Sequence, residues 1–138
     1  MRRLPVRGHC LCGAISYEVS AEPSWSCHCH CSDCRRNTGG AVATFVGFLR
    51  QDFSLTSGDF AVYESSPGVR RSFCSRCGTP MAYEAGRYPG EIHLYLGTLE
   101  HPESYPAQAQ VFCREQLPWF RIDGEGPCYA TNLTTEKD

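Results

Sequence analysis

The sequence predicts a mainly β protein that forms one domain over residues 1–138 and is stapled by zinc. The length of 138 residues fits a single domain. Short runs of β-branched and aromatic residues alternate with turns that contain Gly or Pro, which is typical of sheets built from short strands. Ten cysteines, most of them in tight groups, exceed what packing requires. We therefore expect small sheets joined through metal–thiolate bonds.

The expected strands follow one another along most of the chain. Residues 14–19 alternate apolar and polar side chains, as a half-buried strand does. Residues 41–49 are the most apolar stretch, and their length and flanking glycines favour a buried core strand over a helix. The other candidates are separated by turn sequences, which implies a meander. They are residues 53–56, 60–63, 69–73, 81–85, 91–96 and 108–113.

One helix and a proline-rich end complete the predicted elements. Residues 32–38 fit a short helix with Ser32 or Asp33 as its N-cap and glycine at its end. Prolines punctuate the last third of the chain, where residues 117–120 are expected to pack as an aromatic clamp. Residues 131–138 are expected to form a frayed tail.

Charge and hydropathy exclude two classes of partner. Thirteen Lys and Arg residues against 15 Asp and Glu residues leave no basic surplus for nucleic acid. Residues 1–9 lack the apolar segment of a secretory signal, and the run 41–49 is too short to span a membrane. We therefore expect a cytoplasmic protein. Because thiols stay reduced in that compartment, the ten cysteines favour metal ligation over a disulfide framework.

The most informative stretch is residues 27–36, where four thiols and two imidazoles fall within eight positions. Cys29, Cys31 and Cys34 can place three thiolates around one zinc ion, since C-x-x-C is a chelating knuckle and residues two apart share one side of an extended chain. The fourth ligand decides the role, because catalytic zinc keeps one position open. Cys27 lies on the same side of an extended chain and could close the site, as could a histidine.

A second group of thiols suggests a separate site. Cys74 and Cys77 form another C-x-x-C knuckle, and the clustered pair that remains to complete it is Cys10 and Cys12. A four-thiolate zinc site that ties the first hairpin to the middle of the chain is the economical assignment. The two cysteines left over near the C-terminus, Cys113 and Cys128, are interpreted as a buried residue and a loop thiol.

Three motif blocks carry a family resemblance. They are Gly8-x-Cys10-x-Cys12-Gly13, Cys29-His30-Cys31-x-x-Cys34-Arg35-Arg36-x-x-Gly39 and Phe73-Cys74-x-x-Cys77-Gly78-Thr79-Pro80. Over a core of about residues 6–122, the chain resembles the glutathione-dependent formaldehyde-activating enzyme family. The resemblance implies a fold of several small coiled antiparallel sheets stapled by zinc, which is shared with methionine-R-sulfoxide reductases and a Rab-GTPase exchange chaperone.

The resemblance also implies two zinc ions per chain, one structural and one at the active site. The structural ligands would be Cys10, Cys12, Cys74 and Cys77, and the active-site ligands Cys29, Cys31 and Cys34. The implied activity is that of a carbon–sulfur lyase, S-(hydroxymethyl)glutathione synthase, with glutathione as co-substrate and formaldehyde or a related aldehyde as electrophile. The expected partners are therefore a small thiol and an aldehyde, and the sequence does not indicate an oligomeric state.

The chemistry of a three-thiolate zinc agrees with this activity. Three thiolates leave the ion with a net charge of −1, so it is a poor Lewis acid and suits a soft exogenous thiol better than hydrolysis. Arg35 and Arg36 follow the last ligand and could receive the carboxylates of glutathione, or one of them could support the cluster while the other faces solvent. His28, His30 or water could supply the proton that the product alkoxide needs.

Two alternatives from other classes compete with the enzyme. In the first, both zinc sites are structural and the protein is a non-catalytic module that binds glutathione or a protein. In the second, the cluster over residues 27–34 cycles between thiol and disulfide, which bound zinc would suppress. The state of the fourth ligand position separates the enzyme from the binding module.

Overall fold

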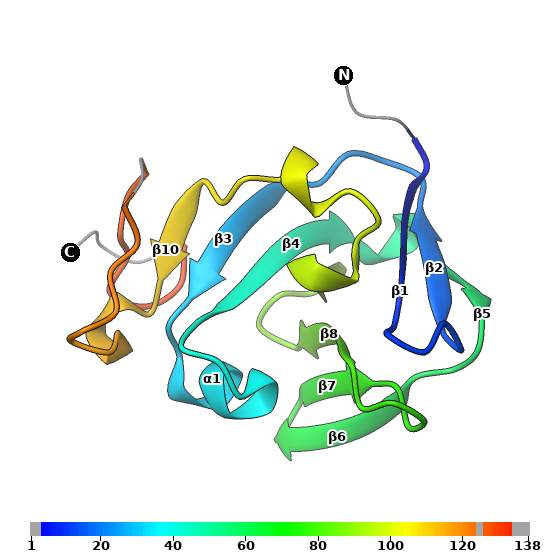
Figure 1. Ribbon diagram of the computed structural model, residues 1–138, viewed down its shortest axis with the longest axis horizontal. Coiled ribbons are helices and arrows are strands. Elements are labelled where there is room, and N and C mark those ends of the chain that lie inside the picture. Colours follow the sequence, from blue (N-terminus) through cyan, green and yellow to red (C-terminus); the bar gives the residue numbers. More distant parts are fainter. Residues whose placement is uncertain (1–3, 124–125, 134–138) are drawn as a thin grey trace.

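The computed structural model describes residues 4–123 and 126–133, which hold ten strands, one α-helix and four 3-10 helices (Figure 1). The strands are β1 (Val6–His9), β2 (Ser16–Val19), β3 (Trp25–Cys29), β4 (Ala43–Leu49), β5 (Phe53–Ser57), β6 (Ala61–Ser66), β7 (Val69–Phe73), β8 (Pro80–Ala85), β9 (Glu91–Tyr95) and β10 (Ala109–Val111). The helices are α1 (Ser32–Thr38), η1 (Arg50–Asp52), η2 (Leu96–Thr98), η3 (Pro102–Ser104) and η4 (Cys113–Glu115).

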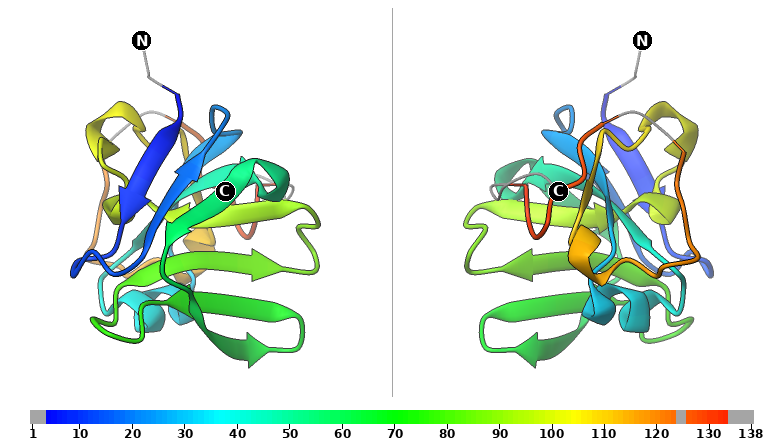
Figure 2. Two further views of the ribbon diagram at one scale, coloured as in Figure 1. Left: turned by 90° about the vertical axis from the view of Figure 1, so that its right-hand side faces the viewer. Right: turned by 90° about the vertical axis from the view of Figure 1, so that its left-hand side faces the viewer.

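The strands form two sheets. The small sheet has the order β1-β2-β5, and the large one the order β10-β3-β4-β9-β8-β7-β6. Neighbouring strands are antiparallel except for β10 and β3, which pair in parallel and make the large sheet mixed. Figure 2 shows the blue β1–β2 hairpin at a steep angle to the green strands of the meander. The mainly β class and the meander are both confirmed.

The large sheet separates two apolar clusters, because alternate residues of a strand face opposite sides. On β4, Val46 and Phe48 belong to a cluster that joins the two sheets. Phe45, which directly precedes Val46 and faces the other side, belongs to a second cluster that contains Cys29 and Cys34. The predicted core strand is therefore confirmed, and it places one set of thiols on the face of the sheet opposite to the small sheet.

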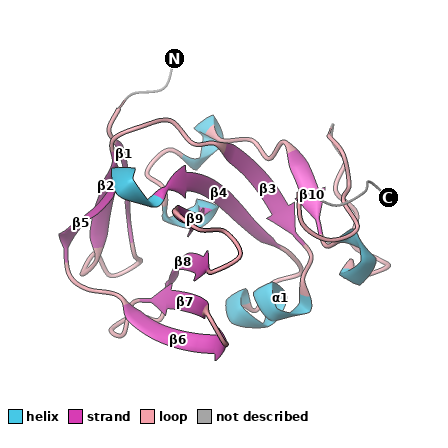
Figure 3. Cartoon of the chain, turned by 180° about the vertical axis from the view of Figure 1, so that it is seen from behind, coloured by secondary structure: helices cyan, strands magenta, loops and turns pink. Residues whose placement is uncertain are grey.

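All predicted strands are present with small shifts at their ends, but β1 and β3 were not predicted. Both are short, with four and five residues, and each is stabilised by pairing with a neighbour, β1 with β2 and β3 with β4. In β1, Gly8 allows a close approach, since a Cβ there would lie 2.3 Å from the hydroxyl oxygen of Tyr17. Figure 3 shows β3 ending between β10 and α1.

The helix α1 spans the predicted residues but has a different cap. Cys31 occupies the N-cap position without a side-chain hydrogen bond, so Ser32 and Asp33 are the first helical residues instead of caps. Gly39 ends the helix in the left-handed conformation, with φ of 74°, and its amide donates to the carbonyl of Arg35.

The C-terminal part differs from the prediction in three ways. Cys113 and Cys128 form a disulfide, so their interpretation as a buried residue and a loop thiol is wrong. Trp119 is 72% exposed and does not act as a clamp. Thr131 accepts a hydrogen bond from the amide of Phe112, so the predicted frayed tail does not begin there. The rest of the predicted tail, residues 134–138, lies outside the described residues.

A search of the described residues for helices found none with the length and apolar character needed to cross a membrane.

Candidate functional site

The first thiol cluster consists of Cys10, Cys12, Cys74 and Cys77. All four sulfur atoms lie within 4.8 Å of one another. The Cys12 sulfur is 3.7 Å from that of Cys10 and 3.9 Å from that of Cys74. Four sulfurs bound to zinc at about 2.3 Å in a tetrahedron are about 3.8 Å apart. The cluster could therefore hold a metal ion, and its spacing suits zinc.

Two turns bring this cluster together from distant parts of the chain. The amide of Ile15 donates to the sulfur of Cys10 at 3.3 Å, and the amide of Leu11 donates to the Thr79 hydroxyl at 3.0 Å, which links the β1–β2 turn to the β7–β8 turn. Hydrogen bonds from the Thr79 side chain and backbone lower the pKa of Cys77 to about 5. Such support from the second turn favours a thiolate, the form that binds metal.

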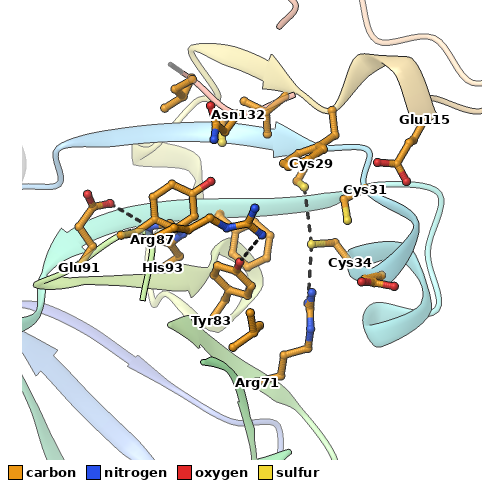
Figure 4. A pocket seen from close by; sticks show the side chains of 18 of the residues that line it. Cys29, Cys31, Cys34, Arg71, Tyr83, Arg87, Glu91, His93, Glu115 and Asn132 are labelled. Atoms are coloured by element: carbon orange, nitrogen blue, oxygen red, sulfur yellow. Dashed lines mark hydrogen bonds and ion pairs between the residues drawn. The ribbon is translucent and has the colours of Figure 1, made fainter. Parts of the chain in front are cut away.

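The second thiol cluster consists of Cys29 at the end of β3, Cys31 at the N-cap of α1 and Cys34 inside α1. The sulfurs of Cys29 and Cys34 lie 3.5 Å apart, and the Cys31 side chain lies beside them (Figure 4). Over the described parts of the chain, only the first cluster has three or more ligand atoms all within 4.8 Å of one another. The second cluster has fewer sulfurs, and they are gathered less closely.

Charge is shared unequally within the second cluster. Hydrogen bonds from Cys29 and Cys34 lower the pKa of Cys31 to about 2. Hydrogen bonding to Cys31 and then to Cys34, together with burial, raises the pKa of Cys29. The cluster thus stabilises one thiolate through two neighbouring thiols, and this negative sulfur is the group that a soft metal ion would bind first.

Cys27 lies beside the second cluster, two residues before Cys29 on β3. It is 3% exposed, and burial followed by the charge of Cys34 raises its pKa to about 12. Cys27 therefore stays a neutral thiol near pH 7, whereas Cys31 ionises readily. Cys27 belongs to the same apolar cluster as Cys29 and Cys34, and its role as the fourth ligand stays a prediction.

A cavity of about 500 Å³ opens next to the second cluster. Cys27, Cys29, Cys31 and Cys34 all line it, whereas no member of the first cluster is among its described lining residues. Its volume lies within the range of pockets that enclose small-molecule ligands. The two thiol clusters therefore differ in access to a ligand as well as in the number of sulfurs.

Arg71 on β7 is a cation in direct contact with the second thiol cluster. Its side chain is buried, and Nη1 donates to the Cys34 sulfur at 3.7 Å (Figure 4). Burial opposes the charge, but the hydrogen bond to Cys34 and the attraction to its charge outweigh this effect and raise the pKa of Arg71. Nε donates to the Ser65 hydroxyl at 3.0 Å, and the guanidinium lies 5.1 Å from the ring centre of Tyr83. A fixed positive charge therefore faces the sulfurs.

A second cation and two phenols lie further along the cavity. Arg87 Nη2 donates to the Tyr83 hydroxyl at 3.2 Å, and its guanidinium lies 5.5 Å from the ring centre of Tyr88. Both arginines thus stack on aromatic rings of the cavity wall, which holds their charge in place. The sequence analysis did not single out Arg87, Tyr83 or Tyr88 for a site, because strand and turn residues carry no ligand spacing.

The far end of the cavity holds a buried histidine. His93 on β9 is 6% exposed, and its Nε2 hydrogen-bonds to Glu91 at 2.9 Å. Burial lowers the pKa of His93, so the ring is neutral near pH 7. The Trp25 ring meets the His93 ring edge-on, with 4.5 Å between the ring centroids. Gly47 makes room for the Trp25 indole, since a Cβ at Gly47 would lie 2.2 Å from an indole carbon.

Four residues that the sequence placed at the site lie outside the cavity lining. Arg35 donates through Nη1 to the backbone carbonyls of His30, at 2.5 Å, and Glu115, and Arg36 is exposed. His28 hydrogen-bonds to the Thr44 hydroxyl at 2.8 Å, and His30 is fully buried against Gln110 at 2.7 Å. Their proposed roles in carboxylate binding and proton transfer stay predictions.

These observations define a class of protein: a mainly β domain with one thiol cluster that could hold a metal and another that faces a cavity. The family model for the glutathione-dependent formaldehyde-activating enzyme matches residues 5–115. Since this match covers most of the chain, the protein belongs to that family.

One curated relative carries the same description, and one solved structure has a similar fold. One is a Halomonas elongata protein described as "Putative glutathione-dependent formaldehyde-activating enzyme", which is 27% identical over 137 residues, 91% of this chain and 87% of the relative. The other is a crystal structure of a Rhodobacter sphaeroides protein, with a TM-score of 0.58 and 27% sequence identity over 68% of this chain and 87% of that chain.

Proposed function

We propose that the protein is a zinc-dependent carbon–sulfur lyase that joins the thiol of glutathione to formaldehyde, or to a related aldehyde, and forms S-hydroxymethylglutathione. The family and the description of the Halomonas elongata relative name both glutathione and formaldehyde. We further propose that each cluster holds one zinc ion.

One observation carries the proposal. The cavity of about 500 Å³ ends on the three thiols Cys29, Cys31 and Cys34. Formaldehyde alone would fill a small part of this space, so a second and larger substrate is expected. Zinc held by three thiolates would keep a fourth, exogenous thiol ionised at neutral pH.

The cavity residues would then orient the substrate and move one proton. The glutathione sulfur attacks the carbonyl carbon, a C–S bond forms, and the π electrons of the C=O bond pass to oxygen. We assign the proton for this oxygen to the Tyr83 hydroxyl, because Arg87 donates to the same hydroxyl and would stabilise it after the proton leaves. Arg87 is also the cavity cation that we expect to receive a glutathione carboxylate.

The test is exchange between free formaldehyde and S-hydroxymethylglutathione, measured by magnetisation transfer so that the uncatalysed reaction can be subtracted. The zinc-loaded protein should speed the exchange, Cys31→Ser should abolish the acceleration, and Tyr83→Phe should reduce it by about 10²-fold or more. No acceleration above the uncatalysed rate would contradict the proposal. An unchanged rate in Tyr83→Phe would remove only the assignment of the proton donor.

The second candidate is the binding module with two closed sites, and Cys27 favours it. This thiol lines the same cavity, and the charge of Cys34 acts on it. With Cys27 as fourth ligand the second cluster would have no position for an exogenous thiol. Cys27→Ser distinguishes the two functions, because it should disturb the metal only if Cys27 binds it.

A further inference from the structure

The cavity has a wall that comes from the C-terminal part of the chain. Asn132 and Leu133 line it, together with Phe112, which follows β10. Residues 127–133, which we call the C-terminal wall, lie outside the residues 5–115 that the family model matches. One side of the cavity is therefore built by a segment that the family motifs do not describe.

The C-terminal wall is fixed to β10 and η4 by its backbone. The amides of Gln110 and Phe112 donate to the carbonyls of Pro127 and Thr131 at 2.9 and 2.7 Å. In the other direction, the amide of Tyr129 donates to Gln110 at 2.8 Å. Just before the wall, the backbone at Gly126 passes close to the backbone of Gln108. Glycine is required there, since φ is 113° and a Cβ would lie 2.1 Å from the Gln108 carbonyl oxygen. The wall thus continues the edge of the large sheet.

A covalent bond holds the wall at the same place. The Cys113–Cys128 disulfide joins η4, at the end of the family match, to the wall. Glu115, two residues after Cys113, also lines the cavity, and its carboxylate accepts from the amide of Ser32 at 3.0 Å. The disulfide therefore connects two parts of the cavity lining, Glu115 with η4 and the C-terminal wall, and limits how far either can move.

The wall also reaches the opposite rim. Asn132 hydrogen-bonds through its side chain to the Tyr88 hydroxyl, which belongs to the turn between β8 and β9. In the view of Figure 4, Asn132 and Arg71 lie on opposite sides of the cavity. A ligand whose sulfur sits at the cysteines must therefore extend between the wall and the side that carries the arginines.

We propose that the C-terminal wall, clamped by the Cys113–Cys128 disulfide, selects the thiol substrate by the groups that it carries beyond its sulfur. Leu133 and Phe112 offer apolar contacts and Asn132 an amide, which together suit a peptide-like thiol. A thiol with only two carbons would offer the wall much less to contact, because it carries no amide and little apolar surface beyond its sulfur. The inference rests on the proposed function, because it assumes that a thiol occupies the cavity.

The test compares the affinities of a large and a small thiol, glutathione and 2-mercaptoethanol, measured by calorimetry on zinc-loaded full-length protein, with mass spectrometry to confirm that the Cys113–Cys128 disulfide stays intact during the titration. Leu133→Ala should weaken glutathione binding about tenfold, the size expected when a partly buried leucine loses its contact, and leave 2-mercaptoethanol unchanged. The double variant Cys113→Ser/Cys128→Ser should act in the same direction, because it frees the wall. Leu49→Ala, a leucine on β4 outside the cavity lining, is the matched control and should change neither affinity.

Nuclear magnetic resonance on ¹⁵N-labelled protein separates the possible failures. Glutathione should shift amide signals of residues 127–133 together with those of Cys29, Cys31 and Cys34. Shifts at the cysteines without shifts in the wall, or equal losses for both thiols in Leu133→Ala, would overturn the inference and leave the proposed function intact. A wild-type protein that binds neither thiol would overturn the proposed function, and the inference with it.

Discussion

The two thiol clusters of this protein use the same chemistry in different surroundings. The first has four sulfurs, supplied by two turns whose members Cys12 and Cys74 are 62 residues apart, and none of its residues is among the described residues of the cavity lining. The second has three sulfurs within a short stretch, and all of them line the cavity. Exposure alone does not separate the clusters, since Cys12 of the first is exposed and Cys34 of the second is buried.

Under the proposed function, the difference explains why only one of the two thiolate sites would have a catalytic role. A complete set of four ligands linked by long loops mainly stabilises the fold, because the metal closes those loops. A set of three next to a cavity leaves one position for a substrate. The second cluster also has a buried cation beside it, because Arg71 donates a hydrogen bond to Cys34. We infer that the first cluster stabilises the domain and the second binds the substrate thiol.

The largest expected effect concerns stability. Cys77→Ser should unfold the domain, because structural zinc contributes on the order of 10 kcal/mol in small modules and this site ties distant turns together. Cys31→Ser is the matched variant, since both thiols are intermediate in exposure, and it should cost roughly 1–3 kcal/mol because its loop closes locally. Thermal and denaturant unfolding measure both values. Equal losses would mean that both sites are structural.

Metal content should follow the same division. Protein purified without chelator should contain two zinc ions per chain, and a chelator should remove the ion at the second cluster first, because three thiolates hold it less completely than four. Elemental analysis combined with timed release into a colorimetric chelator measures both quantities. Release of the two ions at a single rate would contradict the division of roles.

A smaller effect compares two arginines. Arg87→Ala should weaken glutathione binding by only about 1 kcal/mol, since Arg87 lines the cavity but is exposed to solvent. Arg35→Ala should leave that affinity unchanged and lower the melting temperature, because Arg35 donates to the carbonyls of His30 and Glu115. Calorimetry and thermal unfolding check the pair. The opposite result would restore Arg35 as the carboxylate partner that the sequence suggested.

The smallest effect is the pH dependence of stability at His93. Because burial lowers the pKa of His93 in the folded state, the unfolded chain binds more protons below about pH 6.5, the ordinary value for histidine. Stability from this residue is therefore present above that pH and is lost as the pH falls through the folded-state pKa. His93→Gln should flatten the curve of unfolding free energy against pH below 6.5. A curve of unchanged slope would show that His93 does not contribute.

The sequence predicted the thiol clusters better than the cavity, and the reason is spacing. Ligands such as Cys74 and Cys77 lie close together in the chain, and chelation itself fixes their separation. Cavity residues such as Arg71 and Asn132 come from elements whose contact depends on sheet order and on the C-terminal wall. No local pattern marks them.

The strands could be predicted from the sequence only where a local pattern marks them. The β4 strand was predicted because it is apolar over its whole length, whereas β1 and β3 form through pairing with neighbours. The Cys113–Cys128 disulfide was missed because the expected reducing compartment argued against any disulfide, and because the two residues meet only once Cys128 pairs beside Gln110.

The most direct test of the central claim, that the second cluster is open to a thiol and the first is not, uses cobalt in place of zinc. Addition of glutathione should change the thiolate charge-transfer spectrum of the cobalt protein, whereas S-methylglutathione, which has no thiol to ionise, should not. Cys27→Ser should keep this response. A spectrum that ignores glutathione but changes in Cys27→Ser would show that Cys27 closes the site and would contradict the claim.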